Sequence, residues 1–396
     1  MQLLMFWRQR RNNCSPRKGT VNMENKKFCG NKPNRYCNGL KTDAALFYLA
    51  FFLMVFAKAF GLWQVDRSYY VMFCVSALLL AIRVLMMKKD SRTILTMGLV
   101  LIPSVAVFFI SHETTLLFTC LFVAASKDID FETCIKYACI IYIIAVPLRV
   151  LLYFLGLVEG GSKAIYAHDS SGTPYLVGHT YGYGYVTPNM LFAAVFITVL
   201  LLFYVKRHNL NLGTLLATSI VILIAYVVTK CKTGLVVYLA VVAAIALMKI
   251  YPKKDSWLIV YCLLLVGGSF LLGAVLPFFF SVDNPILFFI NEYLISGRLL
   301  LANNALLASG VGLLGGGGIF VDILYMDVLL NCGITGFIML LLGGAIMLRG
   351  FIKEKNMMGL ICAAAMILYA CMEQFPLNIA MNPFLLYIGC SVYKKC

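Results

Sequence analysis

Charged side chains are scarce in this 396-residue sequence. Asp, Glu, Lys and Arg together make up 13% of it, whereas hydrophobic residues make up 62%. Soluble domains average about 25% charged residues, so the composition excludes an ordinary soluble fold. A membrane-spanning helix needs about 20 apolar residues. The chain is therefore long enough for about a dozen spans, and we expect an all-α polytopic membrane protein.

Several signatures of soluble enzymes and metalloproteins are also missing. There is no GxxxxGK[ST] phosphate loop, so we do not expect direct use of ATP. No acidic pair of the DxD type lies in a predicted outer loop, and the 14 Cys are scattered singly without metal-ligand spacing. Buried thiols are the expected state of these cysteines. We predict no metal and no cofactor.

Positive charge is abundant but unevenly placed. The net charge is +16, and ten of the 33 Lys and Arg lie in the first 41 residues. Residues 1–42 are polar and basic and lack the apolar run of a signal peptide, so we expect a disordered cytoplasmic tail. Most other basic residues lie in alternate short gaps between apolar runs, which indicates orientation in a membrane rather than nucleic-acid binding.

Residues 43–396 are expected to form a single transmembrane domain. The positive-inside rule places both termini in the cytoplasm. We expect this domain to lie in the cytoplasmic (inner) membrane as a multi-pass protein. Two long connections, about 159–187 and 281–321, then lie outside. The expected spans are 43–62, 68–87, 93–110, 112–126, 133–158, 187–205, 212–229, 233–250, 257–280, 322–348, 357–372 and 375–393.

The first outer loop combines aromatic, glycine and imidazole groups. Tyr183 and Tyr185 belong to a Tyr-Gly-Tyr-Gly-Tyr run, and His179 precedes it. Aromatic faces suit the C–H faces of sugar rings, and a histidine suits proton transfer near neutral pH. An interfacial aromatic belt is the alternative for the tyrosines.

Basic residues on the predicted outer side are rare and form the second group of candidates. Arg298, in Ser-Gly-Arg, has the planar fork that suits phosphate, and Lys230 and Lys232 would complete a clamp on an anionic lipid head group. Lipid-interface anchors are the alternative. Arg149 lies deep in the fifth predicted span, where it needs an ion pair, another partner or water.

Carboxylates supply the remaining candidates. Asp322 stands at the start of an apolar segment, where it can orient an acceptor hydroxyl, pair with Arg298 or cap a helix. Glu292 and Asp283 are further candidates for a general base. The stretch 281–335 interrupts the apolar sequence with a concentration of polar residues, a proline and the glycine run Gly315–Gly318. We therefore interpret it as a non-cytoplasmic loop that dips back toward the bilayer and presents a chemical site.

In the order of these motifs the chain resembles the Wzy-type O-antigen, capsule and exopolysaccharide polymerases, in the superfamily that also contains O-antigen ligases. The resemblance extends over most of residues 43–393. It rests on Tyr183–Tyr185, Pro188–Asn189, Lys232–Gly234, Ser296–Arg298, Asp322–Tyr325, Gly333–Gly336 and the Glu373–Asn382 turn.

The resemblance implies a metal-independent glycosyltransferase that joins oligosaccharide repeat units linked to undecaprenyl pyrophosphate, at the outer face of the cytoplasmic membrane. It also implies lipid contacts, a flippase and a chain-length regulator as partners, and no nucleic acid. Pyrophosphate would be held by Arg298, Lys232, Lys230 and Arg149. The general base would be His179, then Asp322 or Glu292, and the glycan would contact Tyr183, Tyr185, Asn189 and Tyr325.

Two other functions remain open on the sequence. A ligase of the same superfamily would transfer a finished glycan to another acceptor. A transporter or flippase of lipid-linked oligosaccharides would instead place its ionisable groups near the membrane midplane, often on broken helices. In this sequence most such groups stand near the predicted outer ends of the apolar segments, which favours the transferase.

Overall fold

The computed structural model describes residues 42–63, 66–168, 174–251, 255–316 and 318–393. Apart from Thr42, which begins the first described helix, the predicted cytoplasmic tail lies outside these residues. The described part belongs to one compact unit.

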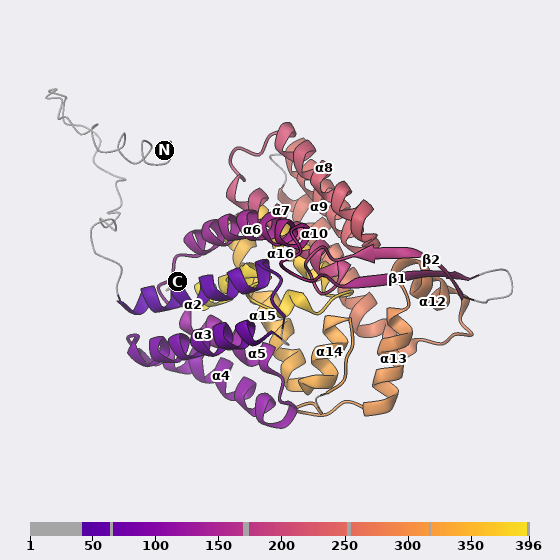
Figure 1. Cartoon of the computed structure of the whole chain (residues 1–396). Coiled ribbons are helices and arrows are strands. Elements are labelled where there is room, and N and C mark those ends of the chain that lie inside the picture. Colours follow the sequence, from indigo (N-terminus) through magenta and orange to yellow (C-terminus); the bar gives the residue numbers. More distant parts are fainter. Residues whose placement is uncertain (1–41, 64–65, 169–173, 252–254, 317, 394–396) are drawn as a thin grey trace, which may run out of the picture. The chain divides into compact units, whose positions relative to one another are not determined.

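Long helices make up most of this unit (Figure 1). Eight of those described are long and apolar enough to cross a membrane, or nine if one bent pair counts as a span. This fits the predicted all-α polytopic membrane protein. The longer helices are α2 (Thr42–Ala59), α3 (Arg67–Met86), α4 (Ser91–Ser111), α6 (Phe131–Phe154), α7 (Pro188–Val205), α8 (Leu212–Thr229), α9 (Lys232–Ile250), α10 (Asp255–Phe270) and α15 (Gly333–Lys353).

Several predicted spans differ from single long helices, so the count of twelve stays a prediction. Two are short, α5 (Thr114–Ala125) and α16 (Met357–Tyr369). The predicted span 257–280 holds α10, a π turn at Leu271–Val275 and α11 (Leu276–Phe279).

Two further predicted spans are interrupted. The segment 322–348 is divided into α14 (Leu324–Asn331) and α15, which begins at Gly333 with a φ of 70°. The segment 375–393 begins with two 3₁₀ turns, Phe375–Leu377 and Pro383–Leu385, and only then continues as α17 (Leu386–Tyr393). Proline explains the late start, because Pro376 and Pro383 cannot donate a helical hydrogen bond.

Both predicted outer loops contain regular structure. The first forms an antiparallel hairpin of β1 (Ser162–His168) and β2 (Pro174–Tyr181), with Lys163 opposite Thr180. The second contains α12 (Pro285–Phe289), a π turn at Ile290–Leu294 and α13 (Arg298–Ser309). The axis bends by 113° between Pro285–Leu294 and α13. The dip of this loop toward the bilayer stays a prediction.

The core forms around α7 and α16. Two thirds of the α7 segment is buried (67%), against 22% for α8. α7 packs against α6, α8, α9 and α16. In α16, the run Ala363–Ala365 is buried, and such small side chains let neighbouring helices approach closely. The ends of these two helices therefore have fixed positions within the unit.

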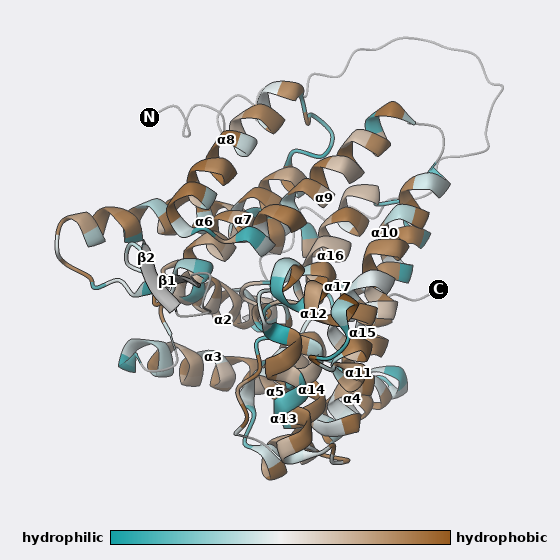
Figure 2. Cartoon of the chain, turned by 90° about the vertical axis from the view of Figure 1, so that its right-hand side faces the viewer, coloured by the Kyte–Doolittle hydropathy of each residue, from teal (hydrophilic) through white to brown (hydrophobic). Residues whose placement is uncertain are grey.

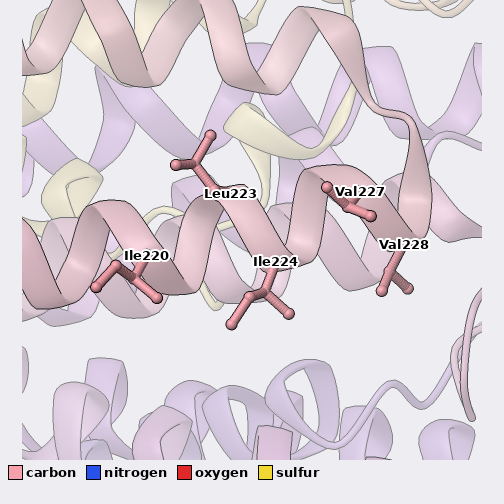
Figure 3. A pocket seen from close by; sticks show the side chains of 5 residues that line it. All are labelled: Ile220, Leu223, Ile224, Val227 and Val228. Atoms are coloured by element: carbon pink, nitrogen blue, oxygen red, sulfur yellow. The ribbon is translucent and has the colours of Figure 1, made fainter.

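The outward face of α8 is aliphatic. Ile220, Leu223, Ile224 and Val227 are each 51–60% exposed, and with Val228 they line a hollow of about 280 Å³ (Figure 3). Figure 2 shows the same pattern more widely, with hydrophobic colour along the long helices and hydrophilic colour at many helix ends. Such a face is favourable against acyl chains and unfavourable against water. We therefore assign it to lipid.

Ile220→Arg tests this assignment, because Ile220 lies near the middle of α8. An arginine at the centre of a spanning helix costs about 2.5–3.5 kcal/mol of insertion free energy. We expect a clear loss of membrane-inserted protein, measured by carbonate extraction and immunoblotting, while Ile220→Leu inserts normally. Normal insertion of the arginine variant would remove this face of α8 from the lipid boundary.

Candidate functional site

Arg298 is positioned by a bend that the local sequence builds. Ser296 and Gly297 both have left-handed backbone angles, with φ of 53° and 81°. This conformation costs a non-glycine residue about 1–2 kcal/mol, so Ser296 is held in place by its surroundings. The buried Asn291 contributes to this: its backbone oxygen accepts from the Gly297 amide at 2.7 Å, and its side-chain oxygen accepts from the Leu300 amide at 3.1 Å.

The guanidinium of Arg298 lies between two carboxylates. Its Nη2 donates to Glu373 Oε1 at 2.8 Å, and its Nε lies 3.5 Å from Asp322 Oδ2. The exposed fractions of the three side chains are 9% for Arg298, 18% for Glu373 and 32% for Asp322. Burial of a charge is costly unless it is paired. The two carboxylates supply that pairing, while Arg298 Nε itself is buried and has no hydrogen-bond partner among the described residues.

Asn189 completes the cluster from the start of α7. Thr187 caps this helix by accepting a hydrogen bond from the Met190 amide, and Pro188 occupies the first helical turn, where its missing N–H costs nothing. Asn189 follows, and its Nδ2 donates to Glu373 Oε1 at 3.0 Å. Two donors therefore hold the same carboxylate oxygen. We call Asn189, Arg298, Asp322 and Glu373 the arginine–carboxylate cluster.

A second set of contacts fixes the turn that carries Glu373. The Leu324 amide donates to the Ala370 carbonyl at 2.9 Å, which joins the start of α14 to the end of α16. The side-chain amide of Gln374 donates to the Val321 carbonyl and, at 3.1 Å, to Asp327 Oδ1. Val321 and Gln374 are the immediate neighbours of Asp322 and Glu373. These bonds therefore hold the two acidic segments side by side.

The environment of Glu373 changes its acidity. Burial raises the pKa of this carboxyl from 4.5 to about 7, and the negative charge of Asp322 acts in the same direction. Arg298, the Asn189 hydrogen bond and the positive charge of Lys163 oppose the rise in pKa. Because the pKa is near 7, Glu373 exchanges a proton near neutral pH.

The two lysines of the predicted clamp lie where α8 is joined to α9: Lys230 is the C-cap residue of α8, and Lys232 is the first residue of α9. Lys230 and Lys232 are exposed, and neither forms an ion pair with a described residue. Their connection packs against the end of α16, where Cys231 Sγ lies 3.7 Å from the Tyr369 hydroxyl. Gly234 permits this packing, because a Cβ there would lie 2.1 Å from the Phe192 ring and 2.6 Å from the Tyr369 hydroxyl.

The three predicted general bases are separated. Asp322 contacts Arg298 and does not cap a helix, because Ile323 is the N-cap residue of α14 and its side chain makes no capping bond. His179 is exposed on β2, with its ring 6.5 Å from that of Tyr181. Glu292 is exposed and accepts a hydrogen bond from Asn291. Of the three, Asp322 alone contacts Arg298 among the described residues.

Other predicted ligand contacts make internal bonds. The Tyr185 hydroxyl donates to the Ala59 carbonyl at 2.6 Å. The Tyr325 hydroxyl lies 3.1 Å from Ser269 Oγ. Arg149 Nε donates to the Gly184 carbonyl at 2.7 Å, and its guanidinium lies over the Phe60 ring. The predicted roles of these residues in binding glycan or pyrophosphate stay predictions.

Tyr183, in contrast, lies at an open groove of about 730 Å³ at the base of the hairpin. Its ring lies 5.5 Å from the rings of Tyr153 and Phe154 and 6.0 Å from that of Tyr181. Glu159 also lines the groove. Aromatic faces beside a carboxylate can stack on sugar rings and accept hydrogen bonds from their hydroxyls. The groove therefore suits a saccharide.

Glu373 is the residue that sequence reasoning did not select as a site residue, although its turn contributed to the resemblance. A signal was present, because Glu373 is an isolated acid between two apolar segments, and ionisable residues there usually carry a function. No group of His, Cys, Asp and Glu with the geometry of a metal site occurs among the described residues.

Comparison with known proteins does not identify the chain, since no family model, no curated protein and no solved structure matches it. The functional assignment therefore depends on the residues and their geometry.

A double-mutant cycle tests the pairing of Arg298 with Glu373. Breaking a buried ion pair from one side leaves an uncompensated charge and costs about 3–5 kcal/mol. We expect Arg298→Ala to lower the melting temperature of the detergent-solubilised protein, and Arg298→Ala/Glu373→Gln to recover more than half of that loss.

Lys230→Ala is the matched control, because the Lys230 side chain is exposed, and it should leave the melting temperature unchanged. Strictly additive effects of the Arg298 and Glu373 substitutions would mean that the two side chains do not interact.

Proposed function

We propose that the protein is a glycosyltransferase of the membrane that joins lipid-pyrophosphate-linked oligosaccharide units into a polymer. The observation that carries the proposal is the arginine–carboxylate cluster. It brings together residues from the start of α7, the start of α13, the segment before α14 and the turn after α16. A paired guanidinium beside a carboxyl that titrates near pH 7 suits transfer chemistry on hydroxyl groups.

Leaving-group stabilisation requires cations that a pyrophosphate can reach. The charge of Arg298 is already balanced by Glu373 and Asp322. Lys163, Lys230 and Lys232 are exposed and make no ion pair with a described residue. In the proposed reaction these lysines attract the pyrophosphate, and Arg298 organises the carboxylates beside it.

The groove at the hairpin base supplies the second element. Lys163 on β1 influences the charge of Glu373, and the same hairpin carries Tyr181 at the groove. In the proposal, one bound glycan stacks a sugar ring on Tyr181 and Tyr183 and also extends to the arginine–carboxylate cluster. This arrangement uses both predicted outer loops.

The lipid-linked glycans of a deletion strain test the function directly. Their size profile on a gel should show single repeat units in excess and no long polymer, and reintroduction of the gene should restore the polymer. Long polymer retained on its lipid carrier would instead identify a ligase. Loss of outward-facing repeat units would identify a transporter, and an unchanged profile would contradict all three functions.

Arg298→Lys tests the role of the cluster in the same strain. Lysine keeps the positive charge, but it cannot bridge Glu373 and Asp322 with a planar fork. We expect a loss of polymer of at least tenfold with normal membrane levels of the protein. Arg92→Lys, at an exposed arginine of α4, is the matched control and should make normal polymer. Wild-type polymer from Arg298→Lys would exclude a specific requirement for the guanidinium.

A further inference from the structure

The carboxylate of Glu373 is held asymmetrically. Arg298 Nη2 and Asn189 Nδ2 both donate to Oε1, at 2.8 and 3.0 Å. No described residue forms a hydrogen bond with Oε2 in the structure, and Oε2 is not among the buried atoms without partners. One oxygen is therefore fixed by the protein, and the other takes no hydrogen bond from a described residue, on a side chain that is 18% exposed.

From this geometry we infer that Glu373 is the general base of the transfer reaction, with Oε2 as the atom that accepts the proton. The inference rests on the proposed function. The geometry of the cluster is the same whatever the role of Glu373, so the proposed function does not depend on this assignment of the base. It does assign the base to a residue outside the three that the sequence selected.

The step balances without a further reactant. Oε2 takes the proton of the acceptor hydroxyl, and that oxygen forms a bond to the anomeric carbon of the donor sugar. The bond between the anomeric carbon and the phosphate oxygen breaks, and its electron pair leaves with the lipid pyrophosphate. Glu373 then returns its proton to water, which restores the carboxylate.

The charges around Glu373 are suited to this role. Arg298, from α13, and Lys163, from β1, favour the carboxylate, whereas Asp322, before α14, favours the protonated form. Cys231, before α9, and Tyr369, on α16, also face Glu373, and both types of group are neutral near pH 7. A base is most effective when its pKa is near the working pH, and the pKa of Glu373 is about 7.

The sign of the pH dependence follows from these neighbours. Glu373 acts as the carboxylate, so the rate should fall as the pH drops below about 7. Asn189→Ala removes a hydrogen bond that favours the carboxylate and should move this acid limb to higher pH. Asp322→Asn removes a negative charge that favours protonation and should move the limb to lower pH. Opposite shifts from two neighbours are not expected from a general loss of structure.

The experiment uses the purified full chain in lipid vesicles, with a lipid-pyrophosphate-linked oligosaccharide as donor and acceptor. We expect Glu373→Gln to lower kcat about 10²- to 10⁴-fold, the range for general-base catalysis, with little change in KM and without the acid limb. Glu373→Asp should keep an acid limb at a reduced rate. Asp255→Asn, at an exposed acid that begins α10, is the control and should match the wild type.

A wild-type kcat and acid limb in Glu373→Gln would overturn the assignment of the base while leaving the proposed function intact. Absence of transfer by the wild-type protein would contradict the proposed function itself. If Glu373→Gln does not fold, the two neighbour variants decide: opposite shifts support the assignment, and shifts in the same direction or no shifts overturn it.

Discussion

The pairing of one buried guanidinium is the constraint on which the candidate site depends. Arg298 is 9% exposed, and an unpaired charge at that depth would cost several kcal/mol. Its two partners lie 24 and 75 positions further along the chain. The bend at Ser296–Gly297, the start of α14 and the turn after α16 must therefore meet. Backbone features position these segments. The left-handed residues Ser296 and Gly297 form the bend, and the Leu324–Ala370 hydrogen bond joins the start of α14 to the end of α16.

The same pairing sets the chemistry that the cluster can support. Arg298 pairs with two carboxylates. Its main effect is therefore on the protonation and orientation of these carboxylates, and its effect on an anionic ligand is secondary. Glu373 consequently combines one fixed oxygen, a second oxygen without a hydrogen bond from a described residue, and a pKa raised to about 7. Arg298 and Glu373 are largely buried, and a low-dielectric surrounding strengthens each charge interaction. Small changes at Asn189 or Asp322 should therefore have measurable effects on Glu373.

Local sequence patterns predicted much of the helical scaffold. The predicted segment 212–229 coincides with α8, because a continuous apolar run ends at Lys230 and leaves little choice of boundary. Arg298 was predicted as a site residue because it is a charged residue in a stretch where apolar residues dominate. The breaks at Cys332–Gly333 and before α17 were not predicted, because glycine and proline are also common inside membrane helices, and hydropathy averages over them.

The residues that depend on tertiary contacts were harder to predict. Glu373 gains its importance from Arg298 and Asn189, which are 75 and 184 positions away, and no local pattern contains that information. In the Tyr-Gly-Tyr-Gly-Tyr run, Tyr185 is 2% exposed and Tyr181 is 44% exposed. The repeat gives all three tyrosines the same local pattern, whereas Tyr185 belongs to the buried core and donates to the Ala59 carbonyl.

A structure with bound substrate would test the account most directly. The chain would be reconstituted in lipid nanodiscs with an acceptor oligosaccharide and a donor analogue in which carbon replaces the scissile anomeric oxygen. We predict the acceptor hydroxyl within about 3 Å of Glu373 Oε2, the reach of a general base, with the pyrophosphate toward Lys230 and Lys232. Density for the reacting groups away from the arginine–carboxylate cluster would contradict the account.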